Sequence, residues 1–221
     1  MVPTKKMERM AGNVRKNCKC SGTGCSICAS KIGRMRDYAN AGIPVVYWSL
    51  PFKKFEGDPR FAESVRGILR DIDSFYDTGK SYAFVGNLGT GKSYAACCIL
   101  KASVISGYDC HYTQMAEIVN TLLSGRDTTG YLADILEYDV LVIDEFDPRW
   151  VFPSVKVERI FGSNLEYILR TRFQNGMPTI VCSNAADIDE VLSNDFAKAF
   201  ASLRNMYMDV HVVTGKDFRK R

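Results

Sequence analysis

The chain has 221 residues, of which 46% are hydrophobic and 24% charged, and its formal net charge is +4. This composition is ordinary for a globular protein, and the length allows one domain with an appendage or two small domains. The sequence contains no apolar run of about 18 residues or more and no signal-peptide pattern, so neither a membrane span nor export is indicated and we expect a cytoplasmic protein.

The charge is distributed unevenly along the chain. Residues 1–36 carry nine basic side chains against the single acidic residue Glu8, so this segment has a net charge of +8 and the remainder a net charge of −4. A basic segment beside a mildly acidic body suggests an anionic partner, with nucleic acid as the first candidate. The alternative is a solvated and partly disordered terminus.

Residues 1–17 indicate irregular or weakly helical structure and lead into a cluster of cysteines. Half of the eight cysteines of the chain fall within eleven residues, namely Cys18, Cys20, Cys25 and Cys28. Four thiolates so close together can supply the tetrahedral sulfur shell that structural zinc prefers. A bound metal would also stabilise a segment that is too small to fold by burial alone. We therefore predict a zinc site.

The spacing of these cysteines, C-x-C-x4-C-x2-C, is tighter than that of the usual pair of zinc knuckles. An iron–sulfur cluster and reduced, unliganded cysteines therefore stay open as alternatives, whereas disulfides do not suit a cytosolic protein. The other four cysteines lie in apolar stretches of the sequence, so we expect them to be small core residues: Cys97, Cys98, Cys110 and Cys182.

A connector and a helix follow the cysteine cluster. Residues 37–60 contain three prolines, Pro44, Pro51 and Pro59, and prolines at this frequency exclude a long helix. We expect the aromatic residues between them to pack onto the body of the protein. Apolar residues then recur at helical spacing from position 61 to position 76, which predicts one amphipathic helix.

A glycine-rich loop lies between two apolar runs, 82–85 and 94–100. Its sequence, G-N-L-G-T-G-K-S, matches the pattern G-x-x-x-x-G-K-[ST] in the strand, loop and helix context that a phosphate loop requires. The glycines let the backbone aim several N–H groups at one anion, and the following helix adds its positive N-terminal end. We predict a triphosphate site made by Gly86, Asn87, Leu88, Gly89, Thr90, Gly91, Lys92 and Ser93. Lys92 would reach the β- and γ-phosphates, and the Ser93 hydroxyl would hold Mg²⁺.

Short strands and helices alternate through the middle of the chain. The pattern predicts a strand over 110–113, a helix over 115–123, a loop over 124–130 and a short helix over 131–136.

Four apolar residues, 140–143, then end in Asp144 and Glu145. Such a run describes a strand buried on both faces, with its acidic end at the carboxyl edge of a parallel sheet, where these sheets bind ligands. We expect Asp144 to hold Mg²⁺ directly or through water, and Glu145 to polarise the attacking water as the general base.

The last third of the chain repeats this alternation. We predict a helix over 155–173, a buried strand over 177–184, a helix over 196–206 and a strand over 210–213. Asn184, at the end of the buried strand, could orient the water opposite the γ-phosphate; the alternative is a simple turn residue. His211 alternates with valines and indicates a core or edge histidine without a functional role.

Three of these segments resemble the motifs of the AAA+ ATPases. Residues 86–93 are similar to Walker A, residues 140–145 to Walker B with its glutamate, and residues 179–184 to a sensor 1 strand. Within these ATPases the chain most resembles the group of DnaC/DnaI helicase loaders and IstB transposition helpers. The basic cysteine-bearing N-terminus, the Gly42-Ile43-Pro44 connector and the closing residues 215–219, similar to G-x-[SD]-[YF]-R, also match this group.

The resemblance covers most of the chain from about residue 40. It implies an α/β fold, in which helices flank a parallel five-stranded P-loop sheet without a separate helical lid. We expect a basic cysteine-rich partner-binding domain over 1–40, a linker over 41–60 and an ATPase domain over 61–221.

The resemblance also implies ATP-dependent self-assembly, in which an arginine of one subunit meets the γ-phosphate bound to its neighbour. The family has two arginines about four residues apart on the helix before the last strand, whereas this chain has Arg204 but Phe200 one turn earlier. Arg204 is the first candidate for this arginine and Lys198 the second, and the alternative is an ordinary exposed arginine. Arg172 also resembles a family arginine and is expected at a subunit or DNA surface.

Three functional hypotheses follow. The first is an ATP-hydrolysing helicase loader that assembles on single-stranded DNA and delivers a replicative hexameric helicase, bound by the basic head, during DNA replication. The second is an IstB-like helper of DNA transposition, and a DNA adaptor that binds but does not hydrolyse ATP is a variant of these two. The third is a small-molecule phosphotransferase, which the pair of Asp144 and Glu145 disfavours because it indicates water as the nucleophile.

Overall fold

The centre of the computed structural model is a sheet of five parallel strands in the order β2-β3-β4-β1-β5. The structure describes residues 5–124, 128–147, 155–184 and 195–218. The strands are β1 (Ser81–Val85), β2 (Cys110–Gln114), β3 (Val140–Asp144), β4 (Thr179–Ser183) and β5 (Met208–Val212). The prediction of a parallel five-stranded sheet flanked by helices is therefore confirmed.

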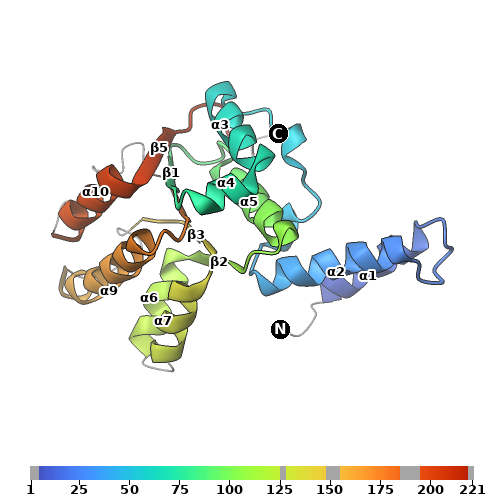
Figure 1. Cartoon of the computed structure of the whole chain (residues 1–221), viewed down its shortest axis with the longest axis horizontal. Coiled ribbons are helices and arrows are strands. Elements are labelled where there is room, and N and C mark those ends of the chain that lie inside the picture. The colour runs from blue at the N-terminus through green and yellow to red at the C-terminus, as the bar shows by residue number, and fades with distance from the viewer. Residues whose placement is uncertain (1–4, 125–127, 148–154, 185–194, 219–221) are drawn as a thin grey trace.

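Two groups of helices cover the two faces of this sheet (Figure 1). One face carries α3 (Pro59–Arg70), α4 (Ile72–Asp77) and α5 (Lys92–Ser106), and the other carries α6 (Met115–Ser124), α7 (Thr128–Glu137), α9 (Val155–Gln174) and α10 (Asp195–Tyr207). Successive residues of each strand point to opposite faces, so that Phe84 enters one core while Ala83 and Val85 enter the other. The central strands β3 and β4 are buried at every position, which explains why most of their residues are apolar.

The N-terminal segment forms two helices, α1 (Lys5–Lys16) and α2 (Ser26–Asn40), with the cysteine cluster between them. In Figure 1 these helices lie side by side and project away from the sheet. We expected irregular or weakly helical structure over 1–17 and did not predict α2. This helix has few apolar positions and buries only Cys28, Tyr38 and Ala39, so its hydrophobic periodicity is weak.

The connector packs its aromatic side chains onto the body, as predicted. It contains two short 3-10 helices, η1 (Val45–Tyr47) and η2 (Phe52–Lys54). Phe52 and Phe55 are both buried, and their rings stack with centroids 5.0 Å apart. Cys97, Cys98, Cys110 and Cys182 are also buried, which confirms their prediction as core residues.

The predicted helix over 61–76 is two helices, so that prediction was wrong in one respect. Asp71 lies between α3 and α4 with φ −144°, outside the helical region, and its carboxylate accepts a hydrogen bond from Ser74 N at 2.9 Å. An aspartate that caps a new helix in this way competes with continuation of the old one. The other difference is α7, which begins at Thr128 within the predicted loop; residues 125–127 of that loop lie outside the described residues.

Among the described residues, no helix is both long enough and apolar enough to cross a membrane.

Candidate nucleotide-binding site

The glycine loop of residues 86–93 connects the end of β1 to the start of α5. Gly86, Gly89 and Gly91 have φ angles of 136°, 78° and 96°, which L side chains rarely adopt. Gly91 is the N-cap of α5 and has no side chain to satisfy the first N–H groups of that helix. These groups therefore offer donors and partial positive charge to an anion.

The side chain of Lys92 folds back into this loop. It is only 4% exposed, and its Nζ donates to the carbonyl oxygens of Gly86 and Asn87, each at 2.7 Å. The ammonium group thus lies within the loop, where a phosphate oxygen can replace a carbonyl as its partner. This position fits the phosphate-binding role predicted for Lys92.

Ser93 and Asp144 meet from α5 and β3. The Ser93 hydroxyl donates to Asp144 Oδ1 at 3.1 Å, and Asp144 is buried. Hydroxyl and carboxylate oxygens in this arrangement are the oxygen ligands that Mg²⁺ uses beside nucleotide phosphates. The two residues therefore fit the predicted magnesium ion. The structure adds a residue that the sequence did not single out, because the O–H of Tyr112 donates to Asp144 Oδ2 at 2.6 Å.

Glu145 and Asn184 lie next to this pair. Each follows the last residue of its strand, β3 or β4, and the side-chain amide of Asn184 donates to Glu145 Oε2 at 2.7 Å. Glu145 is exposed and has φ 51°, the left-handed region that a residue with a side chain rarely occupies. Strain of this kind is often stored at functional sites. The predicted roles, Glu145 as the general base and Asn184 as the residue that orients the water, stay predictions.

The segment after β5 lies against the glycine loop, a relationship that the sequence did not reveal. Phe218 N donates to the carbonyl oxygen of Gly89 at 3.1 Å, and a Cβ atom at Gly89 would clash with the carboxylate of Asp217. Asp58 also contacts this segment, because its carboxylate accepts hydrogen bonds from Thr214 Oγ1 at 2.7 Å and Thr214 N at 3.3 Å. The closing motif therefore borders the site, although its last residue, Arg219, lies outside the described residues.

Arg204 is far from the glycine loop of its own chain. It lies in the last turn of α10, and β5 then starts at Met208, opposite Ser81 at the start of β1. Arg204 therefore lies toward the amino edge of the sheet, whereas the loop follows the carboxyl end of β1. The Arg204 side chain donates to Asn205 Oδ1, with Nη2 at 3.0 Å. Arg204 could therefore contact a γ-phosphate only in the nucleotide site of a neighbouring subunit. That role stays a prediction.

Phe200, at the position where the family has its second arginine, belongs to the core. Its side chain is fully buried, and its ring centroid lies 5.0 Å from that of Phe146, two residues beyond Asp144. The helix packs this position against the sheet, which explains why an apolar residue fits there. The side chain of Lys198, the second candidate, lies outside the described residues.

Arg172 corrects an expectation, because it is not at a surface. Its side chain is fully buried, and its guanidinium donates to five oxygens. These are Thr179 Oγ1 and the carbonyl oxygens of Ile135, Leu136, Tyr138 and Pro178. Burial lowers the pKa of Arg172 to about 10, so the group is charged at neutral pH. Arg172 thus ties the end of α7 to the start of β4.

The four cysteines at the junction of α1 and α2 form one cluster, with Cys28 in the first turn of α2. The Sγ atoms of Cys18, Cys20, Cys25 and Cys28 all lie within 4.8 Å of one another. Two of the pairs, Cys18 with Cys25 and Cys20 with Cys28, are 3.5 Å apart. A tetrahedral zinc ion with Zn–S bonds of ~2.3 Å requires sulfurs roughly 3.8 Å apart, so the cluster can hold such an ion.

Local hydrogen bonds also favour a thiolate in this cluster. The backbone N–H groups of Cys25 and Gly24, followed by the thiol of Cys28, lower the pKa of Cys20 to about 5. Thiolates are the form of cysteine that binds metals. The donor set therefore suits zinc in its chemistry as well as in its spacing.

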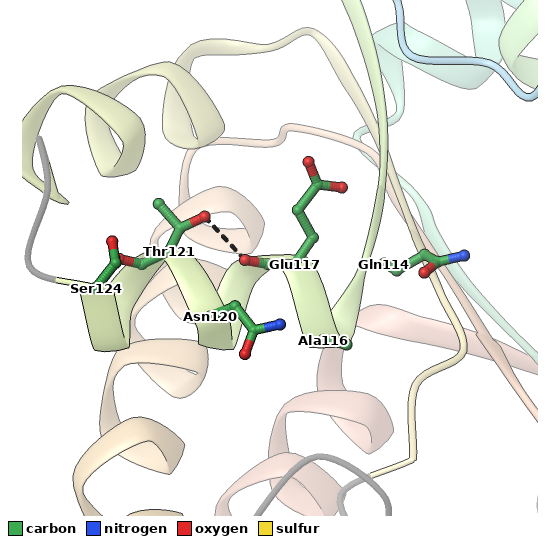
Figure 2. A pocket seen from close by; sticks show the side chains of 6 residues that line it. All are labelled: Gln114, Ala116, Glu117, Asn120, Thr121 and Ser124. Carbon is green, nitrogen blue, oxygen red and sulfur yellow. Dashed lines mark hydrogen bonds between the residues drawn. The ribbon is translucent and has the colours of Figure 1, made fainter.

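An open depression of about 670 Å³ follows the polar side of α6 (Figure 2). It is lined by Gln114, Ala116, Glu117, Asn120, Thr121 and Ser124. Amide and hydroxyl groups predominate there, and Glu117 is the one charged residue of the lining. Gln114 pairs with Asp144 in the sheet, but β3 and β4 separate β2 from the strand that carries the glycine loop. The lining contains none of the residues predicted for the nucleotide site, although Gln114 adjoins Asp144 in the sheet.

The sheet order, the glycine loop after β1 and the acidic pair at the end of β3 define the class of protein: a P-loop ATPase domain of the AAA+ type. The chain belongs to the family of IstB-like ATP binding proteins, whose model matches residues 53–216. Membership in this family implies that the site binds ATP with Mg²⁺.

Solved structures of replication proteins have the same fold. The crystal structure of DnaI matches with a TM-score of 0.61 and 18% identity over 77% of this chain and 94% of the other. The crystal structure of the DnaC helicase loader matches with a TM-score of 0.59 and 20% identity over 77% and 100%. Domain III of the Thermotoga maritima replication initiation protein DnaA matches with a TM-score of 0.59 and 16% identity over 76% of this chain and 68% of the other. No curated protein matches the sequence.

Proposed function

We propose that this protein is an ATP-hydrolysing helicase loader that assembles on single-stranded DNA and delivers a replicative hexameric helicase during DNA replication. The observation that carries the proposal is the presence, in one chain, of an AAA+ nucleotide site and a separate basic head with a cysteine cluster. DnaI and DnaC, which share the fold, support it, since DnaC is described as a helicase loader. The proposal places the protein in the cytoplasm.

ATP binding would use the loop and the helix behind it. The N–H groups at the start of α5 and the ammonium of Lys92 would neutralise the charge of the triphosphate. Ser93 and Asp144 would hold Mg²⁺, which would supply further positive charge next to the phosphates. Both side chains already lie in contact in the described structure.

Hydrolysis would use Glu145 as the general base. Asn184 holds Oε2 of this carboxylate, so Oε1 is the oxygen left to accept a proton from water. The amide would thereby fix the direction of the base, which is a more specific role than the water-orienting one expected from the sequence.

Self-assembly would complete the site. Arg204 lies toward the edge of the sheet opposite its own loop, so a neighbour's γ-phosphate is the partner that it could reach in a ring or filament. An arginine supplied in trans stabilises the charge that develops as the phosphate leaves. Hydrolysis would therefore depend on the assembled state.

The head, residues 5–40, would bind the helicase. Nine basic side chains lie within residues 1–36, and the cysteine cluster lies at the junction of α1 and α2. Contact with an acidic surface of a partner follows from this charge. A zinc ion at the cluster would hold the two helices in one arrangement.

Affinity capture tests the proposal. The Glu145→Gln protein with ATP and Mg²⁺ should retain a hexameric helicase from a lysate of the source cells, identified by mass spectrometry. Lys92→Ala should retain none, because it does not bind ATP. Capture of single-stranded DNA is measured in parallel with the same two variants.

The second candidate function is assistance to a transposase, and the observation that favours it is the IstB-like family itself. Capture of a transposase in place of a helicase would assign this function. Capture of DNA alone, together with ATP binding but no hydrolysis, would identify a DNA adaptor and would contradict the loader.

A further inference from the structure

Tyr112 contacts Asp144 from a strand that carries none of the nucleotide-binding motifs. Its O–H donates to Asp144 Oδ2 at 2.6 Å, and the residue is only 8% exposed. The other oxygen, Oδ1, accepts hydrogen bonds from Ser93 Oγ at 3.1 Å and from Glu145 N at 2.9 Å. Donors from three different segments therefore hold the two oxygens of one carboxylate.

The position of Tyr112 is itself fixed from two sides. Within the sheet it pairs with Val142 of β3. On its other side, Tyr112 N donates to the carbonyl oxygen of Ala41 at 2.8 Å, where α2 ends. Gly42 permits this close approach, because a Cβ atom there would lie 2.6 Å from the carbonyl oxygen of Tyr112. The backbone of Tyr112 is thus held between the connector and β3.

The direction of this hydrogen bond is fixed by chemistry. An ionised carboxylate can only accept hydrogen bonds, so the O–H of Tyr112 is the donor and Asp144 Oδ2 the acceptor. Charge-assisted hydrogen bonds of this kind are short and strong.

We propose that Tyr112 is a positioning residue for the magnesium site, which sets the orientation of the Asp144 carboxylate toward the Ser93 hydroxyl and the metal. This inference rests on the proposed ATPase function. Mg²⁺ demands near-ideal octahedral geometry, so it discriminates strongly against a ligand that is free to rotate. Groups that hydrogen-bond a metal ligand from behind fix its orientation and support metal affinity.

Tyr112→Phe tests the role because it removes the hydroxyl and keeps the ring. The matched control is Tyr76→Phe, since Tyr76 also donates to an aspartate, Asp139 Oδ1 at 3.1 Å, just before the start of β3. The binding of fluorescently labelled ATP is measured first in EDTA and then at increasing Mg²⁺ concentrations. Mn²⁺ binding in the presence of ATP is counted by electron paramagnetic resonance, which does not depend on turnover.

In EDTA, we expect the nucleotide affinity of Tyr112→Phe to lie within about twofold of the wild-type value. The Mg²⁺ and Mn²⁺ concentrations at half-maximal binding, the midpoints, should rise about tenfold. Tyr76→Phe should keep the wild-type midpoints. Melting curves check folding, and Tyr112→Leu, which lacks the same hydroxyl, should share the raised midpoints.

The inference would be overturned if both Tyr112 variants needed the same Mg²⁺ and Mn²⁺ concentrations for half-maximal binding as the wild type, provided that the wild type itself depends on the metal. The proposed ATPase would then remain. Weaker nucleotide binding of Tyr112→Phe already in EDTA would also overturn the inference, because the hydroxyl would then serve the loop rather than the metal. A wild-type protein whose nucleotide binding ignores Mg²⁺ would overturn both.

Discussion

The side-chain amide of Asn184 donates to Oε2 of Glu145 at 2.7 Å, across the carboxyl ends of the neighbouring strands β4 and β3. The hydrogen bond leaves Glu145 oriented at the edge of the sheet where the glycine loop also lies. In the proposed role of general base, a carboxylate held in this way would need little reorganisation when water approaches. The amide of Asn184 is the contact that orients this carboxylate.

Glu145→Gln should therefore retain ATP binding and lose hydrolysis. The amide is nearly the same size as the carboxylate but cannot accept a proton, so we expect turnover to fall about a hundredfold or more. Phosphate release and fluorescent ATP binding measure the two properties separately. Wild-type turnover in this variant would remove Glu145 from the role of general base.

Lys92→Ala should abolish measurable nucleotide binding. The ammonium lies inside the glycine loop, and its loss removes the charged donor for the phosphates. We expect the affinity to fall below the range that the titration can detect. Calorimetric titration with ATP measures it. Lys80→Ala is the control, since Lys80 pairs with Asp209 at 2.6 Å before β1 and should bind ATP normally.

Removal of the metal should abolish partner binding by the head and leave ATP hydrolysis unchanged. Purified protein should contain about one zinc ion per chain by elemental analysis, and Cys20→Ser should lose it. We expect the variant to keep its ATPase activity and lose capture of the partner, because the cluster is distant in sequence from every nucleotide motif. Cys110→Ala, at a buried cysteine of β2, should keep the metal. ATPase loss together with the metal would contradict this separation.

Arg172→Met should destabilise the protein without changing the nucleotide site. The substitution leaves four carbonyl oxygens without their charged donor, so we expect the free energy of unfolding in urea to fall by about 3 kcal/mol. Arg170→Met is the matched control on the same helix. Arg170 forms an exposed pair with Glu166 at 2.6 Å, and its loss should cost less than about 0.5 kcal/mol.

Acidification should destabilise the protein through His111. Burial lowers the pKa of this histidine from 6.5, against the opposing carboxylates of Glu117, Asp109 and Asp134, while its ring stacks on Tyr138. The unfolded state therefore binds more protons below about pH 6.5, and stability falls as the pH drops through that range. Melting temperatures from pH 7.5 to 5 measure the effect.

His111→Phe should reduce this pH dependence without removing it. Burial also lowers the pKa of His211, which should supply the remaining slope in the same direction. An unchanged slope in the His111→Phe protein would exclude His111 as a cause of the pH dependence.

Local patterns in the sequence were enough to predict the strands, the glycine loop and the acidic pair. Each depends on neighbours within a few residues, as in the apolar run that ends at Asp144 and Glu145, or the glycines that precede Lys92. Periodicity also predicted most of α9 and α10, whereas α5 was expected from the context of the glycine loop. It failed at Asp71, where a side chain caps a second helix, and along α2, where few apolar positions mark the buried side.

Contacts between distant segments were decided only by the tertiary structure. No spacing in the sequence relates Tyr112 to Asp144, Asp217 to Gly89, or Arg172 to the carbonyl oxygens at the end of α7. Arg172 shows the reason most clearly, because an arginine in a helix predicts exposure. Only the packing of α9 against α7 and β4 supplies enough acceptors to bury its charge. Residue types and their spacing therefore predict the chemistry of the nucleotide site, whereas the packing of the strands and the connector brings further residues, such as Tyr112, into contact with it.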